Sequence, residues 1–84
     1  MSWYVYILEN ETGLRYVGYT GRDPERRLQE HNDGLNRWTG ARRPWRLVYS
    51  EFHQSKSDAV RRERYLKTGA GREERDRLVA GTQG

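Results

Sequence analysis

The stretches Trp3-Tyr4-Val5-Tyr6-Ile7-Leu8 and Leu14-Arg15-Tyr16-Val17-Gly18-Tyr19-Thr20 decide the fold of this 84-residue chain. Both are rich in aromatic and β-branched residues, which favour strands. The polar segment between them, Glu9 to Gly13, has the length and the terminal glycine of a hairpin loop. Because the first stretch is apolar on both faces, we expect it to be a central strand with other elements packed on each side.

The remaining segments predict helices that pack on this sheet. Asp23 is an expected helix cap and Pro24 the first helical residue. This helix is expected to end at Gly34, and a basic loop at 35–43 and a strand at 45–52 follow it. The next expected helix is capped by Ser55 or Ser57, ends near Lys67 and is terminated by residues 68–71. A short helix at 72–80 completes the chain. The sequence therefore predicts an α+β domain with a small three-stranded, largely antiparallel sheet and flanking helices, spanning residues 1–84.

The charge of the chain favours a polyanionic partner. The net charge is +4 and the isoelectric point is near 9.8. Only Lys56 and Lys67 are lysines, and the other 14 basic residues are arginines, whose planar fork grips phosphate with two hydrogen bonds. A preference for arginine codons explains the same composition, so charge alone leaves nucleic acid unproven. Without cysteine, any metal must be held by oxygen or imidazole.

No targeting or membrane-spanning signal is visible in the sequence. No apolar run approaches the roughly 18 residues that span a bilayer, and the N-terminus lacks a charged segment followed by an apolar stretch. We therefore expect a cytoplasmic protein without a membrane partner. The sequence does not indicate the oligomeric state.

Glu63 lies at the centre of the inward side of its predicted helix. At about 100° per residue, this side also carries Ala59, Val60, Leu66 and Lys67. A buried carboxylate without a partner is costly, so Glu63 requires a cation or hydrogen-bond donors. One interpretation is an ion pair with a neighbouring arginine. The other is a ligand for a divalent metal, since a single carboxylate completed by water and substrate phosphate suits Mg²⁺ or Mn²⁺.

Arg27 and His31 share one face of the first predicted helix because they are four residues apart. Leu28 is the strongly apolar residue of this helix, so its burial brings both side chains close to the sheet. A solvated charged face is one interpretation. In a functional site, Arg27 would stabilise a pentavalent phosphate and His31 would hydrogen-bond a phenol or phosphate.

Tyrosines gather on the predicted strands. Tyr4 and Tyr6 share one face of the first strand, and Tyr16 and Gly18 share one face of the second. Such tyrosines usually pack with a hydrogen-bonded hydroxyl. With a reference pKa of roughly 10, a phenol is a poor base at neutral pH unless a metal or an arginine lowers its pKa. Gly18 lets a backbone or a ligand approach closely.

Taken in this order, the residues resemble the GIY-YIG nuclease family. In that family a Gly-Ile-Tyr triplet on one strand faces a Tyr-Ile-Gly triplet on the next. Tyr4-Val5-Tyr6 corresponds to the first triplet and Tyr16-Val17-Gly18 to the second. The helical arginine of the family, the histidine one turn later and the metal-binding glutamate match Arg27, His31 and Glu63.

The likeness is greatest to small stand-alone bacterial members that resemble the N-terminal domain of the excision-repair nuclease subunit. The stretches 42–45 and 65–72 are typical of them. Valine replaces both isoleucines of the triplets, and Tyr4 replaces the first glycine, which narrows the space beside Tyr6.

The resemblance implies a divalent-metal-dependent endonuclease that hydrolyses DNA phosphodiester bonds in DNA repair or recombination. Glu63 would bind a single Mg²⁺ or Mn²⁺, and Arg27 would neutralise charge that develops on the phosphoryl group. Tyr6 would activate or position the attacking water, with Tyr16 and His31 in support. The resemblance leaves open which phenol acts as base; we expect Tyr6.

The predicted basic loop is the candidate DNA contact. Arg37, Arg42 and Arg43 would hold phosphates while Trp38 stacks on an exposed base, and the alternative is a mobile surface loop. An 84-residue chain leaves no room for a separate DNA-targeting domain. We therefore expect low specificity, recognition of a branched or damaged DNA shape, or a protein partner that supplies targeting.

Two other functions remain open on the sequence. The first is a nucleic-acid-binding module without cleavage activity, in which Glu63 is only a salt-bridge partner. The second is a protein-interaction domain that presents its arginines to an acidic partner.

Overall fold

A computed structural model describes residues 2–83 of the chain, and this part contains three strands and four helices. In chain order these are β1 (Trp3–Asn10), β2 (Arg15–Thr20), α1 (Pro24–Asn32), α2 (Arg37–Gly40), β3 (Trp45–His53), α3 (Lys56–Lys67) and α4 (Gly69–Gln83). None of these helices is long and apolar enough to cross a bilayer.

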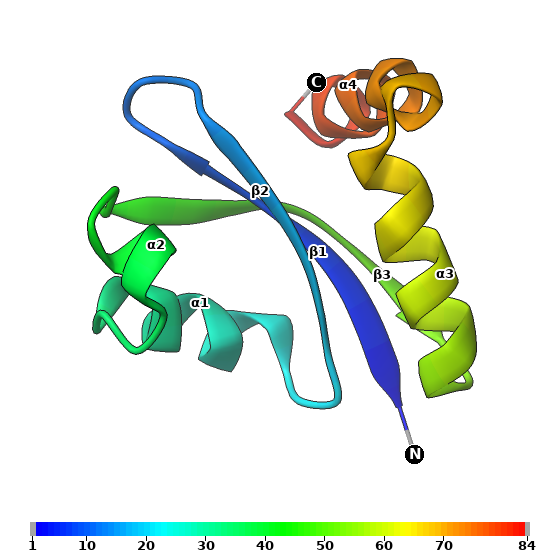
Figure 1. Ribbon diagram of the computed structural model, residues 1–84, viewed down its shortest axis with the longest axis horizontal. Helices are drawn as coiled ribbons and strands as arrows, with labels where there is room; N and C mark the ends of the chain where they lie inside the picture. Colours follow the sequence, from blue (N-terminus) through cyan, green and yellow to red (C-terminus); the bar gives the residue numbers. More distant parts are fainter. Residues whose placement is uncertain (1, 84) are drawn as a thin grey trace.

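The strands form one antiparallel sheet in the order β2-β1-β3. Helices α1 and α2 lie on one side of this sheet, and α3 and α4 lie on the other (Figure 1). The predicted α+β architecture is therefore confirmed, and β1 is the central strand, as its two apolar faces indicate. β2 and β3 form the two edges of the sheet.

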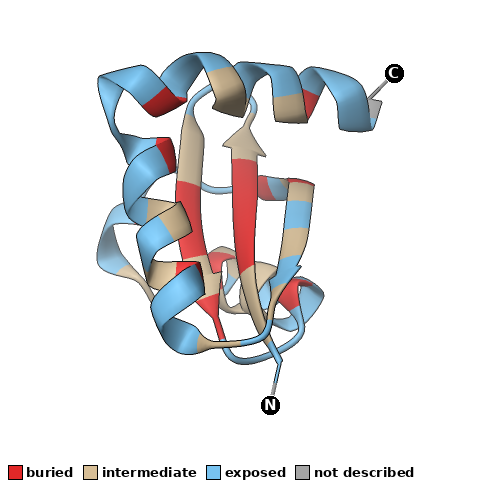
Figure 2. Cartoon of the chain, turned by 90° about the vertical axis from the view of Figure 1, so that its right-hand side faces the viewer, coloured by how far each residue is buried: buried red, intermediate tan, exposed pale blue. Residues whose placement is uncertain are grey.

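Two hydrophobic clusters, one on each face of the sheet, hold the layers together. Val5 and Ile7 of β1 pack with residues of α3 and α4, including Ala59, Leu66 and Val79. Tyr6 and Leu8 point to the opposite face, where the members of the second cluster include Trp45, Tyr16 and Leu28. Buried residues accordingly follow the strands and the sides of the helices that face them (Figure 2). Alternation along β1 therefore sends Tyr6 toward α1 and Val5 toward α3.

Most of the predicted helix starts are confirmed. The Asp23 side chain caps α1 by accepting a hydrogen bond from the backbone N–H of Glu25. Of the two serines proposed to cap α3, Ser55 does so, accepting from the backbone N–H of Asp58 at 3.2 Å. These caps satisfy N–H groups that the first turn of a helix leaves unpaired.

Two predicted boundaries were wrong. The 35–43 segment contains the short helix α2, which begins because the Asn36 side chain accepts from the backbone N–H of Thr39. The last helix begins at Gly69 rather than at residue 72. Thr68 Oγ1 accepts from the backbone N–H of Gly71, and a Cβ at position 71 would lie 2.0 Å from the Tyr65 carbonyl oxygen. This glycine thus permits a tight junction between α3 and α4 and does not terminate a helix.

Candidate active site

A pocket of about 380 Å³ opens beside β2, the edge strand that lies between α1 and α3. Its lining includes four of the five predicted catalytic residues, namely Tyr6, Tyr16, Arg27 and Glu63, together with Gly18 and Lys56. The fifth, His31, is fully buried in α1 directly behind Tyr6. Residues from two strands and two helices on opposite faces of the sheet therefore meet at one edge.

Gly18 allows the Tyr6 phenol to reach this pocket. Gly18 is the partner of Tyr6 in the antiparallel register of β1 and β2. A Cβ at position 18 would lie 2.5 Å from the Tyr6 hydroxyl oxygen and 2.7 Å from Cζ. The ring of Tyr6 therefore crosses β2 through the space that a side chain at position 18 would fill.

Replacing Gly18 by alanine is expected to displace Tyr6. Tyr6 is only 1% exposed, so its ring has little room to move, and overpacking of this kind costs about 1–3 kcal/mol of unfolding free energy. The measurement is the free energy of unfolding in urea, together with the tyrosine ring resonances by NMR. The matched control is Gly81→Ala in α4, where an added Cβ meets no atom within 4 Å. Equal stability of the Gly18→Ala and wild-type proteins would contradict the close packing of Tyr6 against Gly18.

A buried hydrogen-bond chain holds the Tyr6 hydroxyl. Tyr6 Oη lies 2.9 Å from His31 Nε2, and His31 Nδ1 lies 2.7 Å from Thr39 Oγ1. The Thr39 hydroxyl donates to the Asn36 carbonyl oxygen at 3.4 Å, so it accepts from Nδ1–H of His31. His31 Nε2 is then an acceptor, and the Tyr6 O–H donates to it. A lone pair on the Tyr6 oxygen remains for a ligand in the pocket.

Both titrating groups of this hydrogen-bond chain, Tyr6 and His31, are neutral at physiological pH. Burial raises the pKa of the Tyr6 phenol, with Tyr16 and Glu63 acting in the same direction and Arg27 in the opposite one. Burial and the nearby Arg27 guanidinium lower the pKa of His31 from 6.5 to about 4. Tyr6 is therefore a hydrogen-bonding phenol in the protein without metal, and His31 is a neutral imidazole.

The depressed pKa of His31 makes stability depend on pH. Between pH 6.5 and pH 4, His31 of the unfolded chain gains a proton that folded His31 does not, so acid favours unfolding. The contribution of His31 to the free energy of unfolding is fully present above pH 6.5. Roughly 2–3 kcal/mol of it is lost as the pH falls toward 4. Urea unfolding at several pH values measures the slope, which we expect to be smaller in His31→Gln. An NMR titration of His31 with a midpoint at or above 6.5 would contradict this expectation.

Arg27 is fixed at the wall of the pocket by an acidic partner. Its Nη1 donates to Glu30 Oε1 at 2.8 Å, and the second oxygen of Glu30 accepts from Arg22 at 2.8 Å. The Arg27 side chain remains 28% exposed. One edge of the guanidinium is thus used to orient the group, and the remaining N–H donors are available to an anion in the pocket.

Glu63 pairs with a lysine of its own helix rather than with an arginine. Lys67 Nζ donates to Glu63 Oε2 at 2.9 Å, and the Glu63 side chain is 13% exposed. The Lys67 side chain is 47% exposed, and a pair of this kind contributes only about 0–1 kcal/mol. A divalent cation in the pocket can therefore displace Lys67 at little cost.

The residues around Glu63 fit a hard divalent ion. The carboxylate lies in a pocket lined by phenols and an arginine, and oxygen is the ligand that Mg²⁺ and Mn²⁺ prefer. Within residues 2–83, no group of three or more His, Asp or Glu residues lies close enough together to hold an ion. At this site, the described part of the chain thus offers one carboxylate, leaving the other positions to water and phosphate oxygens.

Of the four predicted DNA-contact residues, Arg37 and Trp38 lie on α2, and Arg42 and Arg43 lie in the connection that follows it. The ring centroids of Trp38, in α2, and Tyr16 are 6.0 Å apart, and the Arg42 guanidinium lies 4.2 Å from the centroid of the Trp38 ring. Arg37 is exposed on α2, and Arg43 packs against Gly34. Tyr16 thus connects the predicted contact segment to the candidate active site.

Tyr4 does not line the pocket, although it stands where the family has a glycine. Its ring packs edge-on against Phe52 of β3, with centroids 6.0 Å apart. It follows that the Tyr4 ring turns toward the β3 edge of the sheet, while the pocket lies at the β2 edge.

Comparison with known proteins identifies the family. The model of the GIY-YIG catalytic domain matches residues 2–75. The chain belongs to the GIY-YIG family. A UPF0213 protein of Staphylococcus saprophyticus is 42% identical over 66 residues, covering 77% of this chain and 79% of that protein. A UPF0213 protein of Staphylococcus aureus is 41% identical over 68 residues, covering 80% and 82%.

A solved relative has the same architecture. The solution NMR structure of a UPF0213 protein from Bacillus halodurans is 40% identical to this chain, with a TM-score of 0.57. The match covers 95% of this chain and 84% of that one. The α+β fold and the family resemblance that the sequence predicts are thus confirmed.

Sequence reasoning missed several residues that support this site of the GIY-YIG domain. Glu30 orients Arg27 and Lys67 pairs with Glu63, and their spacings of three and four residues are a signal that the sequence does carry. Lys56 lines the pocket and lies two turns before Glu63 on α3, a spacing that the sequence also carries. Thr39 fixes His31 from the next helix, and periodicity within one helix does not indicate this contact.

Proposed function

We propose that this protein is a divalent-metal-dependent endonuclease that hydrolyses DNA phosphodiester bonds. The observation that carries the proposal is the convergence of Tyr6, Tyr16, Arg27 and Glu63 in one pocket of a GIY-YIG domain. The pocket joins a carboxylate for a cation, a guanidinium for an anion and a phenol that can hold water. This combination suits phosphoryl transfer, because its catalysis is mostly positioning and charge stabilisation.

In this proposal Glu63 holds a single Mg²⁺ or Mn²⁺. When bound, the ion neutralises charge on the scissile phosphate and on the leaving 3′-oxygen. Lys67, once released from Glu63, stays near enough to contribute a positive charge at the same edge of the pocket. Arg27, oriented by Glu30, donates hydrogen bonds to the phosphoryl oxygens as negative charge accumulates on them.

Tyr6 positions the attacking water and passes on its proton. The Tyr6 O–H donates to His31 Nε2, so the phenol oxygen accepts a hydrogen bond from water in the pocket. As the water attacks phosphorus, its proton moves to the Tyr6 oxygen and the proton of Tyr6 moves to His31 Nε2. The raised pKa of Tyr6 disfavours a phenolate that forms before substrate binds. Because burial and Arg27 lower the pKa of His31, the relay needs the negative charge of the substrate phosphate to make His31 more basic. Tyr16 supports it by packing against His31, with ring centroids 5.0 Å apart.

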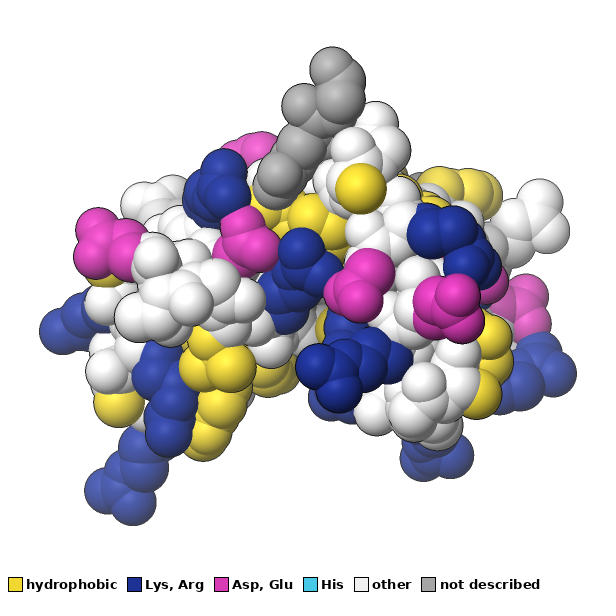
Figure 3. Space-filling view, turned by 90° about the horizontal axis from the view of Figure 1, so that it is seen from above, with side chains coloured by type: hydrophobic (Ala, Val, Ile, Leu, Met, Phe, Trp, Pro, Cys, Tyr) yellow, Lys and Arg dark blue, Asp and Glu magenta, His cyan; other side chains and the backbone are white. Residues whose placement is uncertain are grey.

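The DNA approaches across the basic segment beside Tyr16. Arg37, Arg42 and Arg43 would contact phosphates there, which fits the net charge of +4. Positive and negative side chains are interspersed on the face of the molecule seen in Figure 3. On this face the positive charge is therefore not gathered into a patch of one sign. We further propose a role in DNA repair or recombination, with branched or damaged DNA as substrate.

The test is cleavage of end-labelled duplex and branched DNA with Mg²⁺, Mn²⁺ or EDTA. We expect cleavage only with metal, and products that carry a 5′-phosphate and a 3′-hydroxyl. Cleavage in EDTA, or products with a 3′-phosphate, would contradict the mechanism. Salt-sensitive DNA binding without cleavage of any of these substrates would support the non-catalytic module instead.

A further inference from the structure

A second pocket adjoins the candidate active site on the other side of Tyr16. It measures about 270 Å³ and is lined by Arg15, Tyr16, Val17, Trp38, Lys67 and Arg75. These residues come from β2, α2, α3 and α4. Tyr16 lines both pockets, and Lys67 of this pocket is bonded to Glu63 of the other. A strand whose phosphate lies at Glu63 and Arg27 would therefore place a neighbouring nucleotide here.

The cationic side of this second pocket includes an unsatisfied donor. Arg75 Nη1 donates to the Leu66 carbonyl oxygen at 2.7 Å, but Arg75 Nε is buried without a hydrogen-bond partner. A buried donor left unpaired costs roughly 1–3 kcal/mol. The acidic residues of α4 pair with other arginines, so no carboxylate within residues 2–82 neutralises Arg75. An anionic oxygen in the pocket would compensate the charge of this guanidinium.

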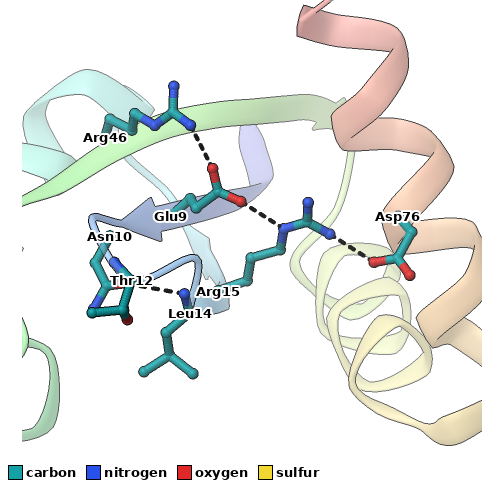
Figure 4. Close-up of polar contacts among 7 residues, drawn as sticks. All are labelled: Glu9, Asn10, Thr12, Leu14, Arg15, Arg46 and Asp76. Carbon is teal, nitrogen blue, oxygen red and sulfur yellow. Dashed lines mark hydrogen bonds and ion pairs between the residues drawn. The ribbon is translucent and has the colours of Figure 1, made fainter.

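Arg15 differs from Arg75 because its charge is already compensated. It bridges Glu9 of β1 at 3.0 Å and Asp76 of α4 at 2.6 Å (Figure 4). Figure 4 also shows Arg46 on the other oxygen of Glu9, so the carboxylate is held between two arginines. Arg15 therefore ties the hairpin to α4 and shapes the wall. Arg75 is the cation available to a ligand, and Lys67 joins it when a metal on Glu63 releases it.

The opposite side of the second pocket is aromatic. The rings of Tyr16 and Trp38 lie 6.0 Å apart at 33°, and Trp38 is 42% exposed. Trp38 also stacks on the buried ring of Trp45, with centroids 6.1 Å apart, which keeps its orientation fixed. Rigid aromatic rings of this kind bind bases by stacking, at about 1–3 kcal/mol per base.

We propose that the second pocket binds one unpaired nucleotide of the DNA strand, next to the phosphate that is cut. Its phosphate lies against Lys67 and Arg75. Its base lies against Tyr16 and Trp38, where it displaces the Arg42 guanidinium that covers the Trp38 ring at 4.2 Å in the free protein. Stacking on Tyr16 and Trp38 requires an exposed base face, so a base must leave the duplex to enter the pocket. The substrate class is therefore DNA with an unpaired nucleotide at the cleavage site, such as a flap. This inference rests on the proposed nuclease function.

The test uses 2-aminopurine, a fluorescent adenine analogue whose emission falls when it stacks on an aromatic ring. Two nicked duplexes carry it either as a one-nucleotide flap or paired at the same position, and a distant label reports binding by anisotropy. EDTA prevents cleavage. The variants are Trp38→Leu and Arg75→Gln. The matched control is Arg77→Gln, an exposed arginine of the same helix.

With the wild-type protein we expect the emission of the flap 2-aminopurine to fall at least about twofold on binding, and the paired probe to change little. Trp38→Leu should remove the fall. Arg75→Gln should weaken flap binding by about fivefold or more and leave the paired duplex nearly unaffected, while Arg77→Gln behaves as wild type.

Unchanged emission in a complex that anisotropy detects would overturn the inference, and so would equal weakening by Arg75→Gln and Arg77→Gln. These outcomes leave the nuclease proposal intact. If the emission falls as expected but the wild-type protein cuts neither DNA with Mg²⁺ or Mn²⁺, the nuclease proposal fails and the nucleotide pocket stands.

Discussion

Glu63→Gln is expected to lower the rate of metal-dependent DNA cleavage at least about 100-fold while the protein stays folded. Glutamine keeps the size of the side chain and an oxygen atom, but it removes the negative charge that holds a divalent cation. The ion pair with Lys67 is lost as well, which costs only about 0–1 kcal/mol because Lys67 is half exposed. The loss of activity should therefore exceed any loss of stability by a wide margin.

Initial cleavage rates at several Mn²⁺ concentrations measure this effect, with urea unfolding to compare stability. The matched control is Glu73→Gln in α4, whose side chain is 87% exposed and which makes only a 4.0 Å pair with Arg77. That variant should retain the wild-type rate. If Glu63→Gln cuts DNA as fast as wild type at every Mn²⁺ concentration, then Glu63 is not the metal ligand.

Arg27→Gln is expected to have the second largest effect, a fall in the cleavage rate of about 100- to 1,000-fold. Arg27 faces the pocket with a guanidinium that Glu30 holds in place, so its hydrogen bonds to the phosphoryl group are preorganised. Because negative charge grows in the transition state, loss of Arg27 should reduce kcat more than it raises KM.

The neighbouring residue supplies a control for this prediction. Arg26→Gln removes the same charge from an exposed position of α1, next to Arg27 in sequence. Steady-state kinetics of both variants should show a large kcat effect for Arg27→Gln and at most a small KM effect for Arg26→Gln. Equal effects would mean that Arg27 acts only through the general charge of the helix. Arg27→Lys should recover only part of the rate, because lysine lacks the planar fork.

The sequence was informative wherever one local pattern carries the structure. β1 is apolar on both faces and lies at the centre of the sheet, and Asp23-Pro24 begins α1 with a side-chain cap. The four-residue spacing of Arg27 and His31 places both on the side of α1 that faces Tyr6. In each case the decisive interaction lies within one turn or one strand, where periodicity applies.

The sequence was less informative where the structure depends on contacts between consecutive helices. Nothing near Thr39 in sequence indicates that its hydroxyl meets His31 Nδ1 across the α1–α2 connection. Gly71 looks like a terminator, yet it is needed because the carbonyl of Tyr65 packs against its Cα. Arg75 lies on a helix that the sequence marks as polar, and only the packing of α4 against α3 shows that its Nε is buried.

The placement of Glu63 depends both on a local pattern and on contacts between elements. Its inward orientation on α3 follows from helical periodicity. Its proximity to Tyr6 depends on α3 and α1 lying on opposite faces of the sheet and meeting beside β2. The narrowness of a three-stranded sheet makes this possible, because β2 is an edge strand and side chains from both faces can reach around it.

The central claim is that this GIY-YIG domain cuts DNA with a bound divalent metal. It is tested most directly by incubating supercoiled plasmid with the wild-type protein and Mg²⁺, Mn²⁺ or EDTA, and by following activity across the chromatographic peak of the protein. The account predicts nicked and linear DNA only with metal, in proportion to the protein in each fraction. Intact plasmid under all conditions, or cleavage that persists in EDTA, would contradict it.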